Sequence, residues 1–414
     1  MNASRTAARS LACIAVAVSL AACGSSPPVA GTWALPAPSA VPESADAGAS
    51  APPSATPSAT PSPPAPSTAA PGPAGLSRPG EHTLATGTVT VTYDVTQAAT
   101  TSLKAKLQEV RPSLAGGTGL ALYLTGGTAL NAADLTALQT LGRSAAEGGL
   151  GLKNLTRLYV YNLRSLPAGR ECTKDSGLAC AGQYATGGYP LLYFNGWWES
   201  WVKHLVLDDL PDIPLGAFSN TDFATVSFRS ARSVGPMAFG HGPHSDLTEL
   251  HLPNVTKIGH DAFRRNQYLV KVSLPKVVTI DDFAFDDASR LAVFDAPNLV
   301  SIGRNALNDA HVLHTVNMPK VEYIGINCFD LNGDVRAGTG VKELRLPKLK
   351  TLDKNAITGF ASLRLLHAPE LTVAWQEAVT DNPSLEEVYA PKLSKIAARA
   401  FANNPKLTRL VVAK

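Results

Sequence analysis

Apolar residues recur at a fixed spacing through the C-terminal part of the chain. The segment LTELHLPNVTKIGHDAF at 247–263 returns six more times in altered form before Lys414. A proline occupies the same place in each copy, with five steps of 22 residues and one of 28, at Pro253, Pro275, Pro297, Pro319, Pro347, Pro369 and Pro391. Repetition at a fixed period of this length indicates a solenoid, in which each turn buries its apolar face against its neighbours.

The first copy shows how one turn should fold. Leu250 and Leu252 are two residues apart and share one face of a strand, while His251 between them faces outward. Pro253 has no amide hydrogen to donate, so it marks the end of the strand. Farther along, each copy places a small residue beside a bulky one, which we expect on a short helical or 3₁₀ turn. The small column is Ala262, Ala284, Ala306, Cys328, Ala356, Ala378 and Ala400, and the bulky column is Phe263, Phe285, Leu307, Phe329, Ile357, Val379 and Phe401.

Less regular turns extend the array toward the N-terminus. Leu155, Leu158 and Val160 have the spacing of the later strand columns, so we place the array at residues 151–414. Residues 168–200 do not fit the columns and form an insertion. A smaller insertion at 331–340 explains the single 28-residue step.

Residues 83–150 alternate strand and helix patterns. The β-branched run 88–95 and the apolar run 120–124 predict strands. Apolar spacing predicts helices over 98–114 and over 132–141, the second capped by Asn131. A repeat array needs a terminal unit with a polar outer face, and this β-α region is the predicted cap. The predicted fold class is therefore an α/β solenoid, a superhelix of repeats with a parallel concave sheet.

The N-terminus has the composition of an export signal. Two basic residues precede the apolar run Leu11–Leu20, and Leu20-Ala21-Ala22-Cys23 follows directly. This resembles a bacterial lipoprotein signal peptide, which implies that residues 1–22 are removed and that Cys23 carries acyl chains such as palmitate. An ordinary secretory signal is the alternative. Residues 23–82 hold the lipidated cysteine and a disordered linker rich in Pro, Ala and Ser, so we expect an exported protein anchored to the outer membrane or cell surface.

The repeats themselves resemble a known family. Their LxLP segment, their Ile-Gly-x-x-Ala-Phe segment and their 22-residue step are similar to BspA-like leucine-rich repeats of bacterial and protist surface proteins. The match extends over about 205–412 and departs from the pattern where Ala374 and Trp375 replace Ile-Gly. The resemblance implies a surface or secreted binding protein, often adhesive, and leaves the partner open.

Outward strand positions are the first candidate binding site. They vary while the inward columns stay apolar, and solenoids bind through such extended faces. A merely solvated face is the alternative interpretation. The candidate partner-binding residues on this face are Tyr159, His251, Asp295, Asn317, Arg345, His367 and Tyr389.

The insertion supplies the second candidate. Trp197 and Trp198 could stack on sugar rings or anchor a protein partner, although a small satellite core is the interpretation we favour. Cys172 and Cys180 lie in an exported segment, where a disulfide between them is expected. Cys328 falls in the small-residue column and is interpreted as a buried free thiol.

Other chemistry is weakly indicated. The histidines at 241, 244 and 260 lack ligands at a recognisable zinc spacing, so we expect no metal site and no cofactor. Lysines that recur after the proline could meet anionic glycans or lipids, but a solvated rim is the simpler interpretation. The net charge is only +3 without blocks of like charge, which argues against nucleic-acid binding. No nucleophile–base set indicates an enzyme.

The sequence therefore predicts a lipid-anchored surface protein that binds a protein or glycan through its concave sheet. The alternative is a structural or self-assembling envelope protein without an external ligand. The oligomeric state is not predicted.

Overall fold

The computed structural model describes residues 83–166, 202–219, 221–240, 246–331 and 340–413, together with the backbone strands at 170–171 and 190–191. Cys23, the linker, Cys172, Cys180 and the two candidate tryptophans lie outside the described side chains. The chain divides into the units Met1–Ala70 and Pro71–Lys414, and every described residue belongs to the second. Within this described part, no helix has the length and apolar character needed to cross a membrane.

The β-α region begins the described chain. Its elements are β1 (Thr88–Asp94), η1 (Val95–Gln97), α1 (Leu103–Glu109), α2 (Arg111–Ala115), β2 (Gly119–Thr125), α3 (Ala132–Gln139) and η2 (Ala145–Glu147). The two predicted strands are confirmed, and the Asn131 side chain accepts from the Asp134 amide to cap α3, as predicted. The single helix predicted over 98–114 is instead two short helices. Pro112, in the first turn of α2, has no amide hydrogen for the preceding helix and ends it.

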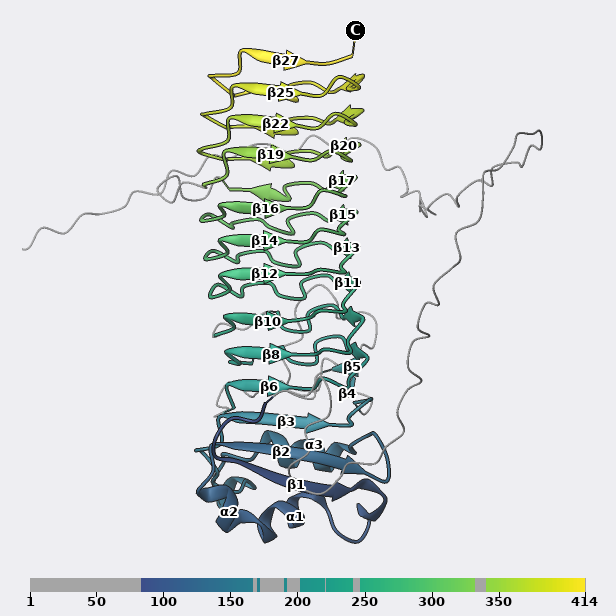
Figure 1. Ribbon diagram of the computed structural model, residues 1–414, viewed down its shortest axis with the longest axis vertical. Helices are drawn as coiled ribbons and strands as arrows, with labels where there is room; N and C mark the ends of the chain where they lie inside the picture. The colour runs from purple at the N-terminus through teal and green to yellow at the C-terminus, as the bar shows by residue number, and fades with distance from the viewer. Residues whose placement is uncertain are drawn as a thin grey trace, which may run out of the picture. The chain divides into compact units, whose positions relative to one another are not determined.

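Three-residue strands form the main ladder, which Figure 1 shows stacked in chain order. A parallel sheet β1-β2-β3-β6-β8-β10 joins the β-α region to the first turns of the array. The parallel ladders β12-β14-β16 and β19-β22-β25-β27 follow. The strands are β3 (Arg157–Tyr161, five residues), β6 (His204–Val206), β8 (Thr225–Ser227), β10 (Glu249–His251), β12 (Lys271–Ser273), β14 (Val293–Asp295), β16 (Thr315–Asn317), β19 (Glu343–Arg345), β22 (Leu365–His367), β25 (Glu387–Tyr389) and β27 (Arg409–Val411).

A second ladder follows the proline turns and runs unbroken along nine turns. Its two-residue strands pair in parallel in the order β26-β23-β20-β17-β15-β13-β11-β9-β7. Ala374 and Trp375, which replace the Ile-Gly pair of the repeat pattern, do not change the register of this ladder. Leu352 pairs with Ala374, just as the equivalent residues of neighbouring turns pair with each other. The strands are β7 (Asp212–Ile213), β9 (Ser233–Val234), β11 (Lys257–Ile258), β13 (Thr279–Ile280), β15 (Ser301–Ile302), β17 (Tyr323–Ile324), β20 (Thr351–Leu352), β23 (Val373–Ala374) and β26 (Lys395–Ile396).

The third side of each turn corrects one prediction. The small and bulky columns do not lie on a helical or 3₁₀ turn; they form a further ladder, which is regular enough to be strands at β18 (Phe329–Asp330), β21 (Ile357–Thr358) and β24 (Val379–Thr380). The Phe263 amide donates to the Ala284 carbonyl of the next turn at 2.8 Å, and Phe285 repeats this to Ala306. Asp261 (φ 54°) and Arg265 (φ 64°) lie on either side in the left-handed region, which prevents a helix from propagating.

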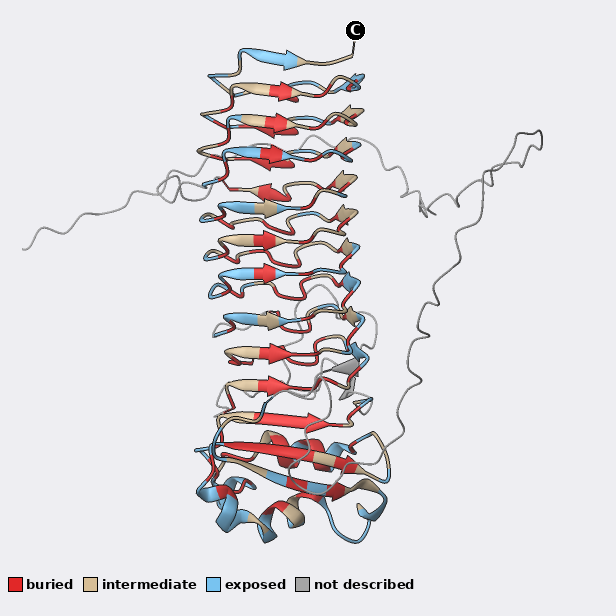
Figure 2. Cartoon of the chain, viewed as in Figure 1, coloured by how far each residue is buried: buried red, intermediate tan, exposed pale blue. Residues whose placement is uncertain are grey.

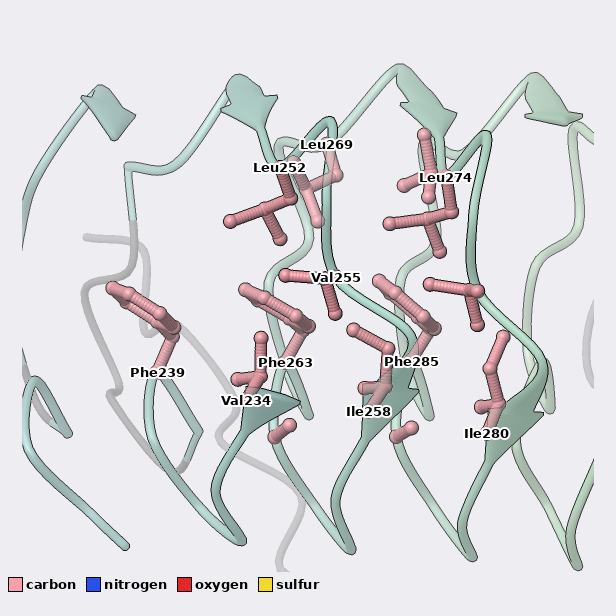
Figure 3. Close-up of a cluster of buried hydrophobic side chains, with 14 of the residues drawn as sticks. Val234, Phe239, Leu252, Val255, Ile258, Phe263, Leu269, Leu274, Ile280 and Phe285 are labelled. Carbon is pink, nitrogen blue, oxygen red and sulfur yellow. The ribbon is translucent and has the colours of Figure 1, made fainter. Parts of the chain in front are cut away.

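The core runs through the middle of the stack (Figure 3). The rings of Phe239, Phe263 and Phe285 stack with centroids 5.2 Å apart, and the side chains of Val255 and Ile258 pack inward beside them. The predicted strand and small–bulky columns are confirmed as buried along most of their length (Figure 2). In the last described turn, Ile396 and Leu410 are exposed.

The insertion at 168–200 departs from the parallel pattern. Its described backbone consists of β4 (Arg170–Glu171) and β5 (Pro190–Leu191), which pair antiparallel with each other, whereas the strand pairs of the described array are parallel. These two strands are thus separate from the repeat ladders.

Candidate recognition face on the three-residue strands

Two outward columns run along the three-residue strands. Parallel register places equivalent residues of successive turns side by side, so that Arg345, His367, Tyr389 and Val411 form one column. We call the outward side chains of β10 to β27 the outer face. Within the ladders β12-β14-β16 and β19-β22-β25-β27, in-register pairing makes each such side chain a neighbour of its counterpart 22 residues away.

On the N-terminal strands β3, β6 and β8 one of the two outward columns is covered, while Arg157, His204 and Thr225 in the other column are partly exposed. The outward residues Tyr159, Val206 and Ser227 are 6%, 8% and 4% exposed. Tyr159 and Val206 pack in a separate apolar cluster with Ala121 and Tyr161. Tyr159 was expected to bind a partner, and its burial in this cluster corrects that expectation.

The other candidate residues of the outer face are accessible. His251, Asn317 and Arg345 are exposed, and Asp295, His367 and Tyr389 are partly exposed. The structure places His367 and Tyr389 next to each other, and Asp295 next to Asn317. His251 lies three turns from Asn317, so the candidates spread over the ladder instead of converging on one point.

Polar side chains on the outer face pair with each other. The Asn317 side-chain amide donates to Asp295 Oδ1 at 2.7 Å. Arg345 donates from Nε and Nη2 to Glu343 on its own strand, at 3.0 and 2.7 Å. Arg409 contacts Glu387 of the preceding turn at 3.1 Å. Most charges of this face are therefore neutralised by a neighbouring side chain. The face presents fixed hydrogen-bonding groups and no strong electrostatic field.

An aromatic pair lies near the C-terminal end of the outer face. The His367 and Tyr389 rings are stacked, with centroids 4.9 Å apart and an interplanar angle of 6°. The partly exposed Leu365 lies two residues before His367 on the same side of the strand. Both ring residues were predicted as candidates, but their contact was not predicted. Their 22-residue separation was the signal that places them side by side.

Hydrogen bonds and ion pairs between turns also line the edges of the solenoid. Lys276 and Lys320 donate to Asn254 and Asn298 of the preceding turns, each at 2.6 Å, and Lys392 contacts Glu370 at 2.7 Å. Hydrogen bonding to Lys392 lowers the pKa of Glu370. Three of the recurring lysines therefore form cross-turn contacts, which fits the interpretation as a solvated rim.

We expect these exposed pairs to contribute little to stability. Replacing Arg364, which donates two hydrogen bonds to Glu386, with alanine should leave the free energy of unfolding almost unchanged, because both partners are solvated. Chemical denaturation of the variant and the parent, at low and high salt, measures this. A salt-independent loss of several kcal/mol would contradict the expectation.

Metal and thiol chemistry find no support among the described residues. No group of three or more His, Cys, Asp or Glu side chains there is arranged to hold a metal ion. His241 and His244 lie outside the described residues, while His260 contacts Asp261 at 2.9 Å. Cys328 is fully buried as a free thiol, as predicted, and burial raises its pKa, which suppresses the reactive thiolate.

Part of the repeat array matches a known protein family. Residues 211–335 match the BspA type leucine rich repeat region in six copies. These residues form a BspA-type leucine-rich repeat region. The BspA-type region includes β7 to β18, where three ladders coil around the phenylalanine core, and the class predicted from the LxLP and Ile-Gly segments is confirmed.

Solved structures with similar coils are bacterial leucine-rich repeat proteins. The leucine-rich repeat protein of T. pallidum is 22% identical over 37% of this chain and 72% of its own, with a TM-score of 0.33. A leucine rich cell surface protein of Faecalibacterium prausnitzii is 17% identical over 51% and 79%, with a TM-score of 0.30. The pneumococcal vaccine antigen PcpA is 14% identical over 51% and 72%, with a TM-score of 0.29. No curated protein sequence matches significantly.

Proposed function

We propose that this chain is a lipid-anchored cell-surface protein that recognises a protein or glycan partner through its outer face. The observation that carries the proposal is the accessible series of strands from β10 to β27, where unlike side chains stand in fixed register within each ladder of the stack. A repeat scaffold of this kind supplies an extended surface whose outward residues can differ without disturbing the core.

The chemistry of the outer face supports a polar but uncharged type of contact. The paired charges Glu343–Arg345 and Glu387–Arg409 lie on either side of the stacked rings of His367 and Tyr389. Aromatic side chains held rigidly beside bonded polar groups are typical of binding hot spots, because little side-chain entropy is lost on contact. The candidate patch is thus β19 to β27.

Truncation of the aromatic pair tests the proposal. Tyr389→Ala combined with His367→Ala should weaken binding to a surface-displayed partner by at least about tenfold, because both rings would be contact residues. Partners are first captured from cell-surface extracts and a glycan array with the full chain, and each affinity is then measured in solution. Thr279→Ala, at the second ladder, is the matched control and should leave affinity unchanged.

Two outcomes would contradict the proposal. One is that Arg345→Ala and the aromatic double variant bind every captured partner as the parent does. The other is that the chain associates only with itself and that the same variants do not alter this association, which would favour a structural envelope protein.

A further inference from the structure

The edge at which the chain enters the three-residue strands differs along the stack. We call the residues that lie one and three positions before each of these strands the entry rim. In Figure 1 the entry rim lies at the left-hand ends of the arrows. Near the N-terminal end, the rim is charged and paired: Lys203 contacts Asp222 at 2.5 Å and Asp246 at 3.2 Å. Toward the C-terminal end, Arg364 pairs with Glu386 at 2.8 Å.

Between these paired segments the rim is apolar and open. Before β12, Tyr268 and Val270 are 43% and 52% exposed, and before β16, Val312 is 36% exposed. The intervening turn joins them, because the Arg290 guanidinium lies 4.7 Å from the centre of the Tyr268 ring and the Ala292 amide donates to the Val270 carbonyl. We call Tyr268, Val270, Arg290, Ala292, Val312 and His314 the middle rim; His314, one position before β16, is exposed, and its Nδ1 lies 3.0 Å from the Thr315 hydroxyl.

Two cations accompany the middle rim without an acidic partner. Neither Arg290 nor Lys271, the first residue of β12, has a carboxylate within ion-pair distance among the described residues. Several other exposed cations of the array do have one, including Lys257 with Asp281, Lys350 with Glu322 and Arg399 with Glu377. Other exposed cations, such as Arg265 and Arg304, also lack a carboxylate partner within the described residues, so the distinguishing feature of this edge is the combination of exposed apolar side chains with positive charge.

We propose that the middle rim is a docking site for a protein segment that carries apolar side chains next to carboxylates. Val270, Val312 and the Tyr268 ring supply the apolar surface. Lys271, next to Val270 on the same turn, and Arg290, on the following turn, supply positive charge. Tyrosine and arginine are enriched among residues that dominate protein interfaces. The site is distinct from the aromatic pair on β22 and β25, so it does not depend on the proposed function of that patch.

An acidic protein segment fits this surface better than an anionic membrane does. Recognition of anionic lipid by surface charge typically uses about 4–8 clustered basic residues. The middle rim has one, Arg290, and Lys271 of the neighbouring strand is a second, beside a narrow apolar strip that follows the stack from one turn to the next. Lysine at 342 and arginine at 364 lie on the rim beyond the 28-residue step, and the second of these is paired.

Selection from a displayed random-peptide library against the full chain tests the proposal. Enriched peptides should combine apolar residues with Asp or Glu. Tyr268→Ser combined with Val270→Ser should weaken their affinity by at least about tenfold. Val278→Ser is the matched control, because Val278 is 41% exposed beside the second ladder and should be neutral. Circular dichroism confirms that each variant is folded.

Charge reversal separates docking from general stickiness. Arg290→Glu combined with Lys271→Glu should abolish binding of the acidic peptides and permit binding of versions in which their Asp and Glu are replaced by Lys. The proposal is overturned if no peptide is enriched, if enriched peptides bind the Tyr268 and Arg290 variants as well as the parent, or if the middle rim binds anionic phospholipid vesicles in preference to peptides.

Discussion

Replacing Phe263 with alanine is expected to lower the free energy of unfolding by about 3–5 kcal/mol. The Phe263 side chain is fully buried, and its ring stacks between Phe239 on one side and Phe285 on the other, with centroids 5.2 Å apart in both directions. Alanine would leave a void in the middle of a column of rings. Rigid ladders on three sides prevent the neighbouring turns from moving in to fill it.

Equilibrium denaturation followed by circular dichroism and fluorescence measures this loss. Phe283→Ala is the matched control, because Phe283 is only partly buried and contacts Arg264 and His260 at the edge, so its loss should cost about 1 kcal/mol. Phe263→Leu should be milder than alanine, since Leu307 fills the same column two turns away. Equal losses for Phe263→Ala and Phe283→Ala would contradict the role given to the ring column.

The repeated core could be predicted because the residues that form it recur in every turn of the sequence. Leu252, Val255 and Phe263 recur at one spacing, so a single physical interpretation applied to every turn. The third side of the turn was predicted wrongly because its geometry depends on residues with positive φ. One of these positions, directly before the small column, is occupied by Asp261, Asn305, Asn327 and Asn355 in different turns. Aspartate and asparagine favour positive φ, so the sequence does carry a signal for this conformation there. Phe283, Glu377 and Arg399 occupy the same position without any such preference, and stacking against neighbouring turns determines their conformation.

The candidate sites were less accessible to sequence reasoning. Alternation correctly placed His367 and Tyr389 on the outward side, and the period made them neighbours. It could not show that Tyr159, at an equivalent outward position, is covered, because the cluster around it includes Leu84 from before the first strand. The middle rim was not predicted as a site, because the sequence does not show which charged side chains form ion pairs. Arg290 has none among the described residues while several cations on other turns do, and this pairing depends on side-chain conformation.

Replacing Asn382 with alanine is the second change expected to be strongly destabilising. This side chain is fully buried, and its amide donates to the carbonyls of Thr380 at 2.9 Å and Ile357 at 3.2 Å, while its oxygen accepts from the Phe360 amide at 2.9 Å. Alanine removes all three bonds. Each buried backbone group left without a partner costs about 1–3 kcal/mol, so a loss of about 3 kcal/mol is expected even if water reaches one of them.

Asn404 provides the comparison that isolates burial from hydrogen bonding. It holds the same position one turn later and donates to the carbonyls of Val379 and Phe401, but it is only partly buried. Asn404→Ala should therefore cost less than half as much as Asn382→Ala, because water can replace the lost bonds. Amide hydrogen exchange should also accelerate at Phe360 in the Asn382 variant, since its acceptor is gone. Equal losses at the two positions, or unchanged exchange at Phe360, would show that the buried asparagine does not stabilise the turn through these bonds.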